Sequence, residues 1–141
     1  MINIEPYLNF NGNCEDAFSF YKSVFGGEFS YISRFEDMPP QEGVPPMPEE
    51  FKRRIMHVSL RVGGIMLMGS DTGGGWAPKF VVGNNVTLTL NADNRQEADK
   101  LFKKLSEGGK VIMPMADMFW GAYYGMFTDK FEVNWMITAG K

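Results

Sequence analysis

Residues 6–29 read PYLNFNGNCEDAFSFYKSVFGGEF, and this stretch decides how the fold begins. Residues 7–10 alternate between two kinds of side chain, which is typical of a β-strand with two different faces. Apolar side chains then recur at helical spacing and predict a helix over residues 13–25, with Asn13 as its N-cap. Gly26 and Gly27 are expected to end this helix. The stretch therefore predicts a strand that leads directly into an amphipathic helix.

A second helix is predicted over residues 95–107. Its apolar side chains fall at positions i, i+3, i+4 and i+7, namely Ala98, Leu101, Phe102 and Leu105. Asn94 and Glu97 form a capping box in which Asn replaces Ser or Thr, and a Gly-Gly pair again closes the helix. The two helices share a weak motif, an apolar pair four residues apart followed by Gly-Gly. They are either products of an internal duplication or unrelated helices that both end in glycine, and the shared order of strands around them favours duplication.

The remaining β-like stretches surround the two helices in the same order. These stretches are residues 29–35, 54–62, 65–68, 86–90, 110–113, 123–128 and 133–137. The order of elements is thus strand, helix and three strands, and this order occurs twice along the chain. We expect one domain over residues 1–141, with one module over about residues 1–72 and the other over about residues 80–141.

This ordered set resembles the vicinal oxygen chelate superfamily, which includes glyoxalase I, bleomycin-resistance proteins and extradiol dioxygenases, and within it the PhnB-like branch. The strings that carry the resemblance are the opening stretch, IMHVSLRVGGIMLMGSD (residues 55–71) and FWGAYYGMFTDKFEVNWMI (residues 119–137). The resemblance implies an α+β fold in which two βαβββ modules form a concave mixed-sheet cup. It also implies that ligands sit in the cup and that the chain forms a homodimer.

The chain departs from the family pattern at one turn. Where the family has Asp-Pro-Phe-Gly, this chain has Asp129-Lys130-Phe131-Glu132. A non-glycine residue therefore stands at a position where a tight turn favours glycine.

Some members of the superfamily bind a divalent metal ion in the cup through four side chains. The residue types at the four corresponding positions of this chain indicate whether it could do the same. Strand alternation places the four positions at Tyr7, near Met68, at Asn85 or Thr87, and at Met136. Harder divalent ions favour carboxylate or imidazole ligands, and thioethers suit Cu(I) instead. The chain also has a single histidine. We therefore expect no metal site of the usual kind and no cofactor.

His57 and Asp71 each allow two interpretations. His57 is a general base or hydrogen-bond donor that faces the cup, or it is a strand histidine satisfied by a neighbour. Asp71 is a carboxylate partner in the site, or it is an ordinary residue at the start of a loop.

Met, Trp and Tyr side chains with a few amides and hydroxyls match the lining of a small-molecule pocket. The predicted pocket residues are Tyr7, Asn9, His57, Met66, Met68, Asn85, Thr87, Trp120, Tyr123 and Met136. The alternative is that these side chains simply fill the core between two small sheets.

Two functions follow from this pattern. The first is a metal-free protein that binds a small apolar or aromatic ligand in the cup. The alternative is a metal-dependent lyase, isomerase or dioxygenase of the glyoxalase type, or an enzyme that uses His57, the one catalytic candidate. Some PhnB-like sequences carry a methyltransferase label, but the chain lacks a Gly-rich strand-to-helix loop for S-adenosylmethionine.

Composition and charge argue against several other classes of protein. The net charge of −3 argues against a nucleic-acid-binding protein, and there is no apolar run long enough to span a membrane. The first residues do not resemble a signal peptide, and the single cysteine, Cys14, fits a reducing compartment. We therefore expect a cytoplasmic protein.

Two loops interrupt the predicted elements. Residues 36–50 contain five prolines and five acidic residues, and they form either a mobile cover over a cavity or a plain surface connection. Residues 71–80 are rich in glycine, but neither a Lys-Ser/Thr pair nor a helix follows them. This second loop therefore does not fit a phosphate-binding loop.

Overall fold

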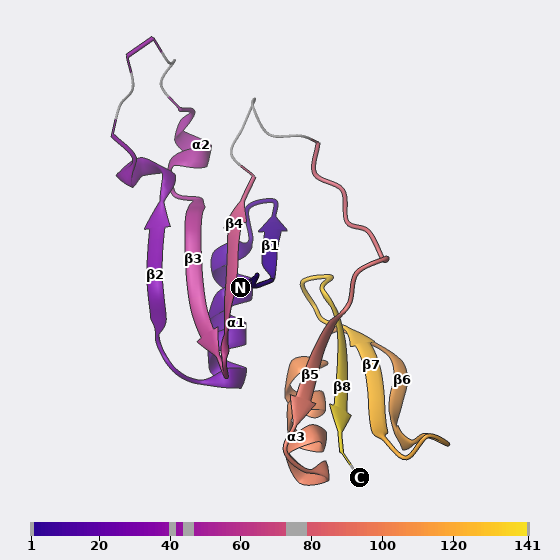
Figure 1. Cartoon of the computed structure of the whole chain (residues 1–141). Helices are drawn as coiled ribbons and strands as arrows, with labels where there is room; N and C mark the ends of the chain where they lie inside the picture. Colours follow the sequence, from indigo (N-terminus) through magenta and orange to yellow (C-terminus); the bar gives the residue numbers. More distant parts are fainter. Residues whose placement is uncertain (1, 40–41, 44–46, 73–78, 141) are drawn as a thin grey trace. The chain divides into compact units, whose positions relative to one another are not determined.

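The computed structural model describes residues 2–39, 42–43, 47–72 and 79–140. Contacts divide the chain into two compact units, residues 1–81 and residues 82–141, and each unit has its own four-stranded sheet (Figure 1). No helix among the described residues is long and apolar enough to cross a membrane.

The first unit is a mixed sheet in the strand order β1-β4-β3-β2. β1 runs parallel to β4, and the other pairs are antiparallel. Its elements are β1 (Tyr7–Phe10), α1 (Cys14–Phe25), β2 (Phe29–Arg34), the 3-10 helix η1 (Phe35–Asp37), α2 (Glu49–Lys52), β3 (Ile55–Val62) and β4 (Ile65–Asp71).

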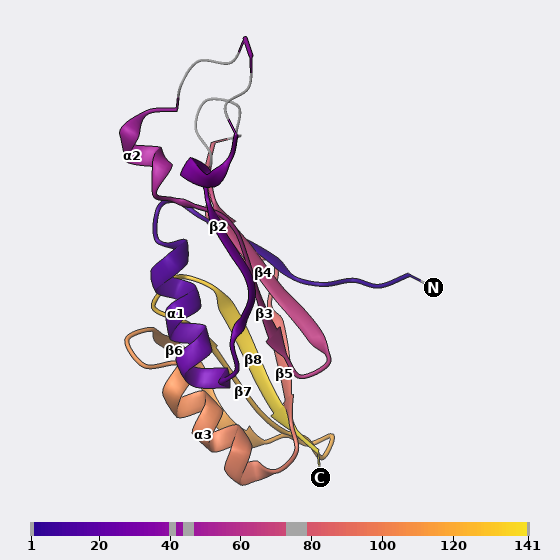
Figure 2. The same ribbon diagram turned by 90° about the vertical axis from the view of Figure 1, so that its left-hand side faces the viewer.

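α1 covers one face of this sheet, and the first core lies between them (Figure 2). Phe18 of α1 meets Phe10 and Tyr21 edge-to-face, with ring centroids 6.2 and 5.5 Å apart. Gly69 of β4 lies beneath the Phe18 ring, where an added Cβ would stand 2.5 Å from a ring carbon. The close approach of helix and strand therefore requires glycine at this position.

The start of α1 is capped from a distant strand. Asn13 makes no side-chain capping hydrogen bond, so the predicted N-cap role is wrong for its side chain. The buried Asp71 carboxylate instead accepts hydrogen bonds from the backbone N–H groups of Gly12 and Cys14, at 2.8 and 3.0 Å. It also accepts one from Ile55 N at 2.9 Å, so a single side chain joins the β1–α1 turn, β3 and β4.

The second unit repeats the same arrangement in the strand order β5-β8-β7-β6. β5 runs parallel to β8, and the other pairs are antiparallel. Its elements are β5 (Leu88–Ala92), α3 (Arg95–Leu105), β6 (Lys110–Asp117), β7 (Tyr123–Thr128) and β8 (Asn134–Ala139).

α3 begins with the predicted capping box. Asn94 Oδ1 accepts a hydrogen bond from Glu97 N at 2.8 Å, while the Glu97 carboxylate accepts one from Asp93 N at 3.0 Å. The helix packs on one face of the second sheet (Figure 2). There Phe102 meets Phe127 edge-to-face, with ring centroids 5.0 Å apart. Trp135 and Ile137 of β8 complete this second core, and both are buried.

The turn between β7 and β8 keeps its geometry without glycine. Glu132 adopts φ +71°, in the left-handed region that usually favours glycine. The buried Asp129 side chain holds the turn, since its Oδ1 accepts hydrogen bonds from Phe131 N and Val133 N and its Oδ2 accepts one from the Trp135 indole.

Several element boundaries differ from those predicted. β4 continues to Asp71, three residues past its predicted end, and β6 continues to Asp117, four residues past its predicted end, because ladder pairing continues beyond the apolar pattern. β5 begins at Leu88, so Asn85 and Thr87 precede the strand. The loop predicted over residues 36–50 contains most of η1 and the start of α2, while residues 40–41 and 44–46 lie outside the described residues, as do residues 73–78 of the glycine-rich loop.

Candidate functional site

The face of the first sheet opposite α1 carries all five predicted pocket residues of this unit. We call it the first open face. Its side chains alternate with the buried residues Phe10, Val58, Leu60 and Leu67, which point toward the helix. The first open face consists of Tyr7, Asn9, Tyr31, Ser33, His57, Ser59, Arg61, Met66, Met68 and Ser70.

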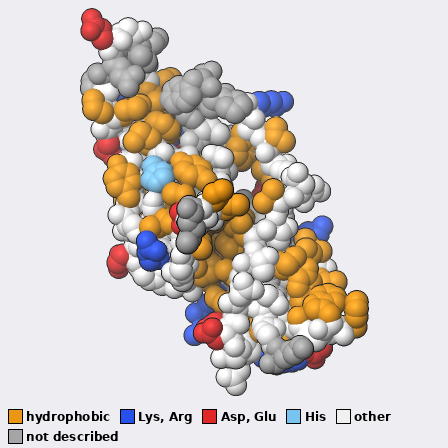
Figure 3. Space-filling view, viewed as in Figure 1, with side chains coloured by type: hydrophobic (Ala, Val, Ile, Leu, Met, Phe, Trp, Pro, Cys, Tyr) orange, Lys and Arg blue, Asp and Glu red, His pale blue; other side chains and the backbone are white. Residues whose placement is uncertain are grey.

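His57 lies at the centre of this face between two tyrosines. Its ring centroid is 5.6 Å from that of Tyr7 and 5.8 Å from that of Tyr31. Its Nδ1 lies 3.3 Å from the Tyr7 hydroxyl and its Nε2 lies 2.9 Å from the Ser59 hydroxyl. Figure 3 shows the imidazole at the surface among hydrophobic side chains. His57 therefore faces the open side and is also satisfied by its neighbours, so the two interpretations of this residue are compatible.

A buried hydroxyl lies beside His57 without a hydrogen-bond partner. Ser33 pairs with His57 across the β2–β3 ladder, is 6% exposed, and its Oγ has no partner among the described residues. An unpaired buried hydroxyl costs about 1–3 kcal/mol, so it usually marks a strained or functional position.

The second sheet has a corresponding second open face, opposite α3. Thr89, Tyr124, Met126 and Met136 lie on it, together with Met113 of the edge strand β6. The Thr89 hydroxyl donates to Met136 Sδ at 3.5 Å, and the Tyr124 hydroxyl lies 4.0 Å from Met126 Sδ. This face is therefore mostly apolar and rich in polarisable sulfur.

One predicted pocket residue lies on the opposite side of this sheet. The Tyr123 hydroxyl donates to the Asp99 carboxylate of α3, and the Arg95 guanidinium stacks 4.3 Å from the Tyr123 ring centroid. The bond to Asp99 raises the pKa of Tyr123. Tyr123 therefore points away from the second open face, whereas its neighbour Tyr124 lies on it, because neighbouring residues of a strand point to opposite faces.

The structure places the other predicted residues as follows. Tyr7, Asn9, His57, Met66 and Met68 share the first open face, and Met136 lies on the second. Trp120 lies in the β6–β7 connection, 53% exposed, and its ring contacts those of Phe119 and Tyr124.

Several residues of these faces were missed by the sequence analysis. On the first face they are Tyr31, Ser33, Ser59, Arg61 and Ser70, and on the second they are Thr89, Met113, Tyr124 and Met126. Alternation from His57 and Met68 could have found Ser59 and Ser70. Tyr31, Ser33 and Met113 were hidden by register shifts in the β2–β3 and β6–β7 pairs, which change the alternation locally.

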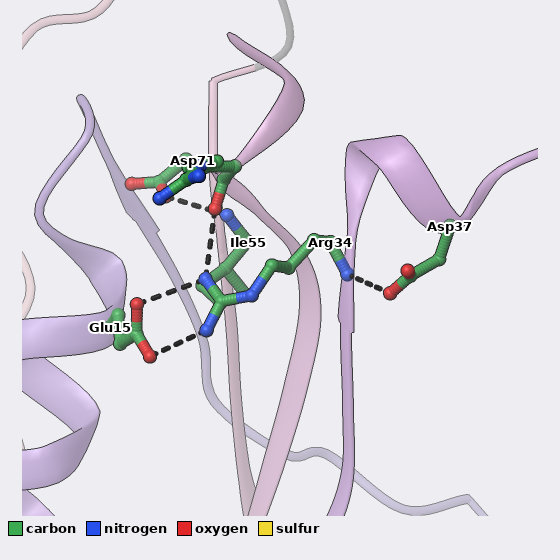
Figure 4. Close-up of polar contacts among 6 residues, drawn as sticks. Glu15, Arg34, Asp37, Ile55 and Asp71 are labelled. Atoms are coloured by element: carbon green, nitrogen blue, oxygen red, sulfur yellow. Dashed lines mark hydrogen bonds and ion pairs between the residues drawn. The ribbon is translucent and has the colours of Figure 1, made fainter. Parts of the chain in front are cut away.

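A charged cleft of about 670 Å³ lies elsewhere in the first unit, beside the start of α1. None of the predicted pocket residues lines it. Arg34 crosses it, donating to both oxygens of Glu15 at 2.7 and 2.9 Å and to the Arg53 carbonyl, while its backbone N–H donates to Asp37 (Figure 4). The hydrogen bonds from Arg34 lower the pKa of Glu15.

Asp71 also lines this cleft, but both oxygens of its carboxylate already accept hydrogen bonds from the backbone. Asp71 is therefore neither a partner of His57 nor a loop residue, and it ends β4. Its role is structural, because it joins the β1–α1 turn and β3 to the end of β4.

The donor types on the two open faces do not fit the divalent ion of the superfamily. Tyr7 and Met68 lie at the expected positions in the first unit, and Met136 lies beside Thr89 in the second. Among the described residues, no three His, Cys, Asp or Glu side chains gather to hold a metal ion. Phenol, hydroxyl and thioether groups are poor ligands for Zn²⁺ or Mg²⁺.

Comparison with known proteins identifies the family. A family model described as 3-demethylubiquinone-9 3-methyltransferase matches residues 2–138. The chain belongs to this family. Protein YjdN of Escherichia coli K12 is 32% identical to it over 143 residues, covering 98% of this chain and 95% of YjdN.

Solved structures agree with this family and with the predicted fold. Protein PA1353 of Pseudomonas aeruginosa is 41% identical, with a TM-score of 0.84 over 99% of this chain and 98% of that one. The PhnB protein of Bacillus cereus is 25% identical, with a TM-score of 0.74 over 99% and 100%. A glyoxalase/bleomycin resistance protein/dioxygenase family enzyme of Burkholderia phytofirmans shares the fold at 16% identity and a TM-score of 0.60 over 96% and 97%. The resemblance to the PhnB-like branch of the vicinal oxygen chelate superfamily is therefore confirmed, as is the α+β class.

Proposed function

We propose that this protein binds a small apolar or aromatic molecule, and that it does so without the divalent metal ion used by some members of its superfamily. The first open face supports this proposal most directly. Tyr7 and Tyr31 flank the single imidazole, and Met68 lies in the same row as both tyrosines. Apolar walls around a few polar groups are the usual composition of small-molecule sites.

The second open face is suited to the same class of ligand. Met126 and Met136 present flexible, polarisable side chains that adapt to irregular shapes and make favourable contacts with aromatic rings. We propose that each face contributes to ligand binding and that the protein acts as a homodimer.

The proposal can be tested with 1-naphthol, a flat aromatic probe with one hydroxyl, in an NMR titration of the full chain. We expect saturable shifts at His57 and Tyr31. Tyr31→Ala should weaken binding about three- to tenfold, because aromatic contacts contribute about 0.5–1.5 kcal/mol beyond the area they bury.

Ile32→Ala provides a matched control for this titration. Ile32 neighbours Tyr31 on β2 and has a similar exposure, 42% against 54%, but it pairs with Val58 and points to the opposite face. Equal losses in the two variants, or no saturable shift at millimolar probe, would count against the proposal.

An enzyme of the glyoxalase type is the alternative function. It is favoured by the chain of groups Tyr7–His57–Ser59, in which an imidazole is held between two hydroxyls and could transfer a proton. Mass spectrometry of the native protein measures how much metal is bound per chain and so distinguishes a metal-dependent enzyme from a metal-free binding protein. About one equivalent of Zn²⁺ or Ni²⁺ per chain would overturn the metal-free proposal. Turnover that is lost in His57→Gln would instead favour an enzyme over a binding protein.

The description of the family also names a methyl transfer. The strand-to-helix turns give little support for a bound S-adenosylmethionine. In the β1–α1 turn, the N–H groups of Gly12 and Cys14 already donate to Asp71, and in the β5–α3 turn those of Asp93 and Glu97 are also used. Calorimetry with S-adenosylmethionine is therefore expected to show no binding, and saturable binding would favour a methyltransferase.

A further inference from the structure

The second open face carries three methionines in one row across three neighbouring strands. Met113 of β6 pairs with Met126 of β7, and Met126 pairs with Met136 of β8. Directly paired residues project from the same side of a sheet, so the three side chains lie next to one another. We call Met113, Met126 and Met136 the methionine row.

The sulfur atoms of the methionine row can donate electron pairs to a ligand on this face. Met136 Sδ accepts a hydrogen bond from the Thr89 hydroxyl. Met126 Sδ lies 4.0 Å from the Tyr124 hydroxyl, the longest distance at which sulfur accepts a hydrogen bond. Met113 is 41% exposed, and the other two are half-buried. A thioether sulfur has two lone pairs, so a hydrogen bond still leaves one for another partner. The row is therefore accessible and is not locked into the core.

The spacing allows the three sulfurs to converge. The Cβ atoms of directly paired residues lie about 4.5–5.5 Å apart, and methionine has three rotatable bonds beyond its Cα. Met126 stands between the other two, so it can share one small ion with either neighbour or with both.

The chemistry of such a site is specific. Thioethers are soft ligands that select Cu(I), whereas Zn²⁺, Mg²⁺ and Ca²⁺ favour nitrogen and oxygen donors. Among the described residues, no group of His, Cys, Asp or Glu competes for a metal ion on this face. We propose that the methionine row is a binding site for a soft monovalent cation, Cu(I), coordinated by Met126 together with Met136 and Met113.

This site shares Met126 and Met136 with the second open face, which the small-molecule proposal also uses, but the 1-naphthol titration is read at His57 and Tyr31 of the first unit. The site lies entirely within the second unit and uses neither His57 nor the first open face. The proposal therefore stands or fails separately from the 1-naphthol titration.

The test uses the full chain with its methionine methyl groups labelled with ¹³C. Ag(I) replaces Cu(I) as a probe that does not change oxidation state. We expect one equivalent of Ag(I) to shift the methyl resonances of the methionine row and to leave most of the chain's eleven methionines unchanged. Cu(I), kept reduced with ascorbate under anaerobic conditions, should be withdrawn from a competing bicinchoninate complex, and Zn²⁺ should not displace it.

Leucine variants test the assignment, because Met→Leu removes the sulfur and nearly conserves the side-chain volume. Met126→Leu should weaken Ag(I) binding at least about tenfold, the lower end of losses seen when metal sites are perturbed. Met118→Leu, in the same unit but outside the row, should bind as the wild type does. A dispersed amide spectrum checks that each variant is folded.

Three results would overturn the proposal. The first is no uptake of either ion, and the second is undiminished binding by the Met126→Leu variant. The third is a set of methyl shifts centred on Met66 and Met68 of the first unit.

Discussion

At the scale of single residues, Glu132 shows that a family turn can survive the loss of its glycine. Its φ of +71° is unfavourable for a residue with a Cβ, by about 1–2 kcal/mol. The Asp129 carboxylate holds the turn through two backbone N–H groups, and Glu132 N donates to Asp129 O at 3.0 Å. Tertiary contacts thus stabilise a conformation that the residue itself opposes.

We therefore predict that Glu132→Gly stabilises the protein by about 1 kcal/mol, since glycine adopts this conformation without a steric penalty. The midpoint of urea denaturation at constant slope measures the gain. Lys130→Gly serves as the control, because Lys130 lies in the same turn but its φ is not positive. It should lose stability, and a gain of equal size there would show that the conformational argument is wrong.

Cys14 provides a second prediction at this scale. The side chain is fully buried at the start of α1, and burial, with the nearby carboxylates of Asp71 and Glu15, raises the pKa of its thiol. Since the thiolate is the reactive form, the native protein should not react with Ellman's reagent at pH 8. The same sample in 6 M guanidinium should release about one equivalent of thionitrobenzoate. Rapid stoichiometric reaction of the folded protein would contradict this prediction.

At the scale of elements, Asp71 determines how the first helix attaches to its sheet. Its two oxygens accept three backbone hydrogen bonds, from the β1–α1 turn and from β3. Asp71→Asn should destabilise the protein by about 3 kcal/mol, because the amide loses the charge and replaces one acceptor oxygen by a donor. Thermal unfolding measures the effect. Asp16→Asn, on the exposed side of the same helix, should change stability by less than about 0.5 kcal/mol.

The sequence predicted the elements well where they are amphipathic and less well at their ends. The apolar stripe of α1 and the capping pair Asn94–Glu97 are local patterns, and the structure contains both. The ends of β4 and β6 depend on pairing with strands far away in the sequence, so the apolar pattern alone stopped too early. Bulges changed the alternation in β2 and β6 for the same non-local reason.

At the scale of the whole molecule, each unit has a helix on one face of a sheet and an open face on the other. The second unit also presents large apolar side chains at its surface, including Ile112 at 55% and Phe119 at 99% exposure. Exposed apolar groups of this size often mark interaction surfaces.

We predict that the chain forms a homodimer. Light scattering coupled to size-exclusion chromatography should give a mass of about twice the 15.9 kDa of one chain. A mass that stays at the single-chain value up to about 100 μM protein would contradict the prediction. Dilution of the sample provides the control for weak association, because a dimer's apparent mass then falls with concentration.

The sequence by itself determined the class of fold and the family, because these depend on element order and on short-range periodicity that a chain carries along its length. It also limited the imidazole groups to one and supplied eleven thioethers. Only the tertiary structure decided that His57 lies between Tyr7 and Tyr31, that Tyr123 turns away toward Asp99, and that three methionines form one row. These arrangements depend on strand register, which is set by pairing between distant segments and which changes the exposed face when it shifts by one residue.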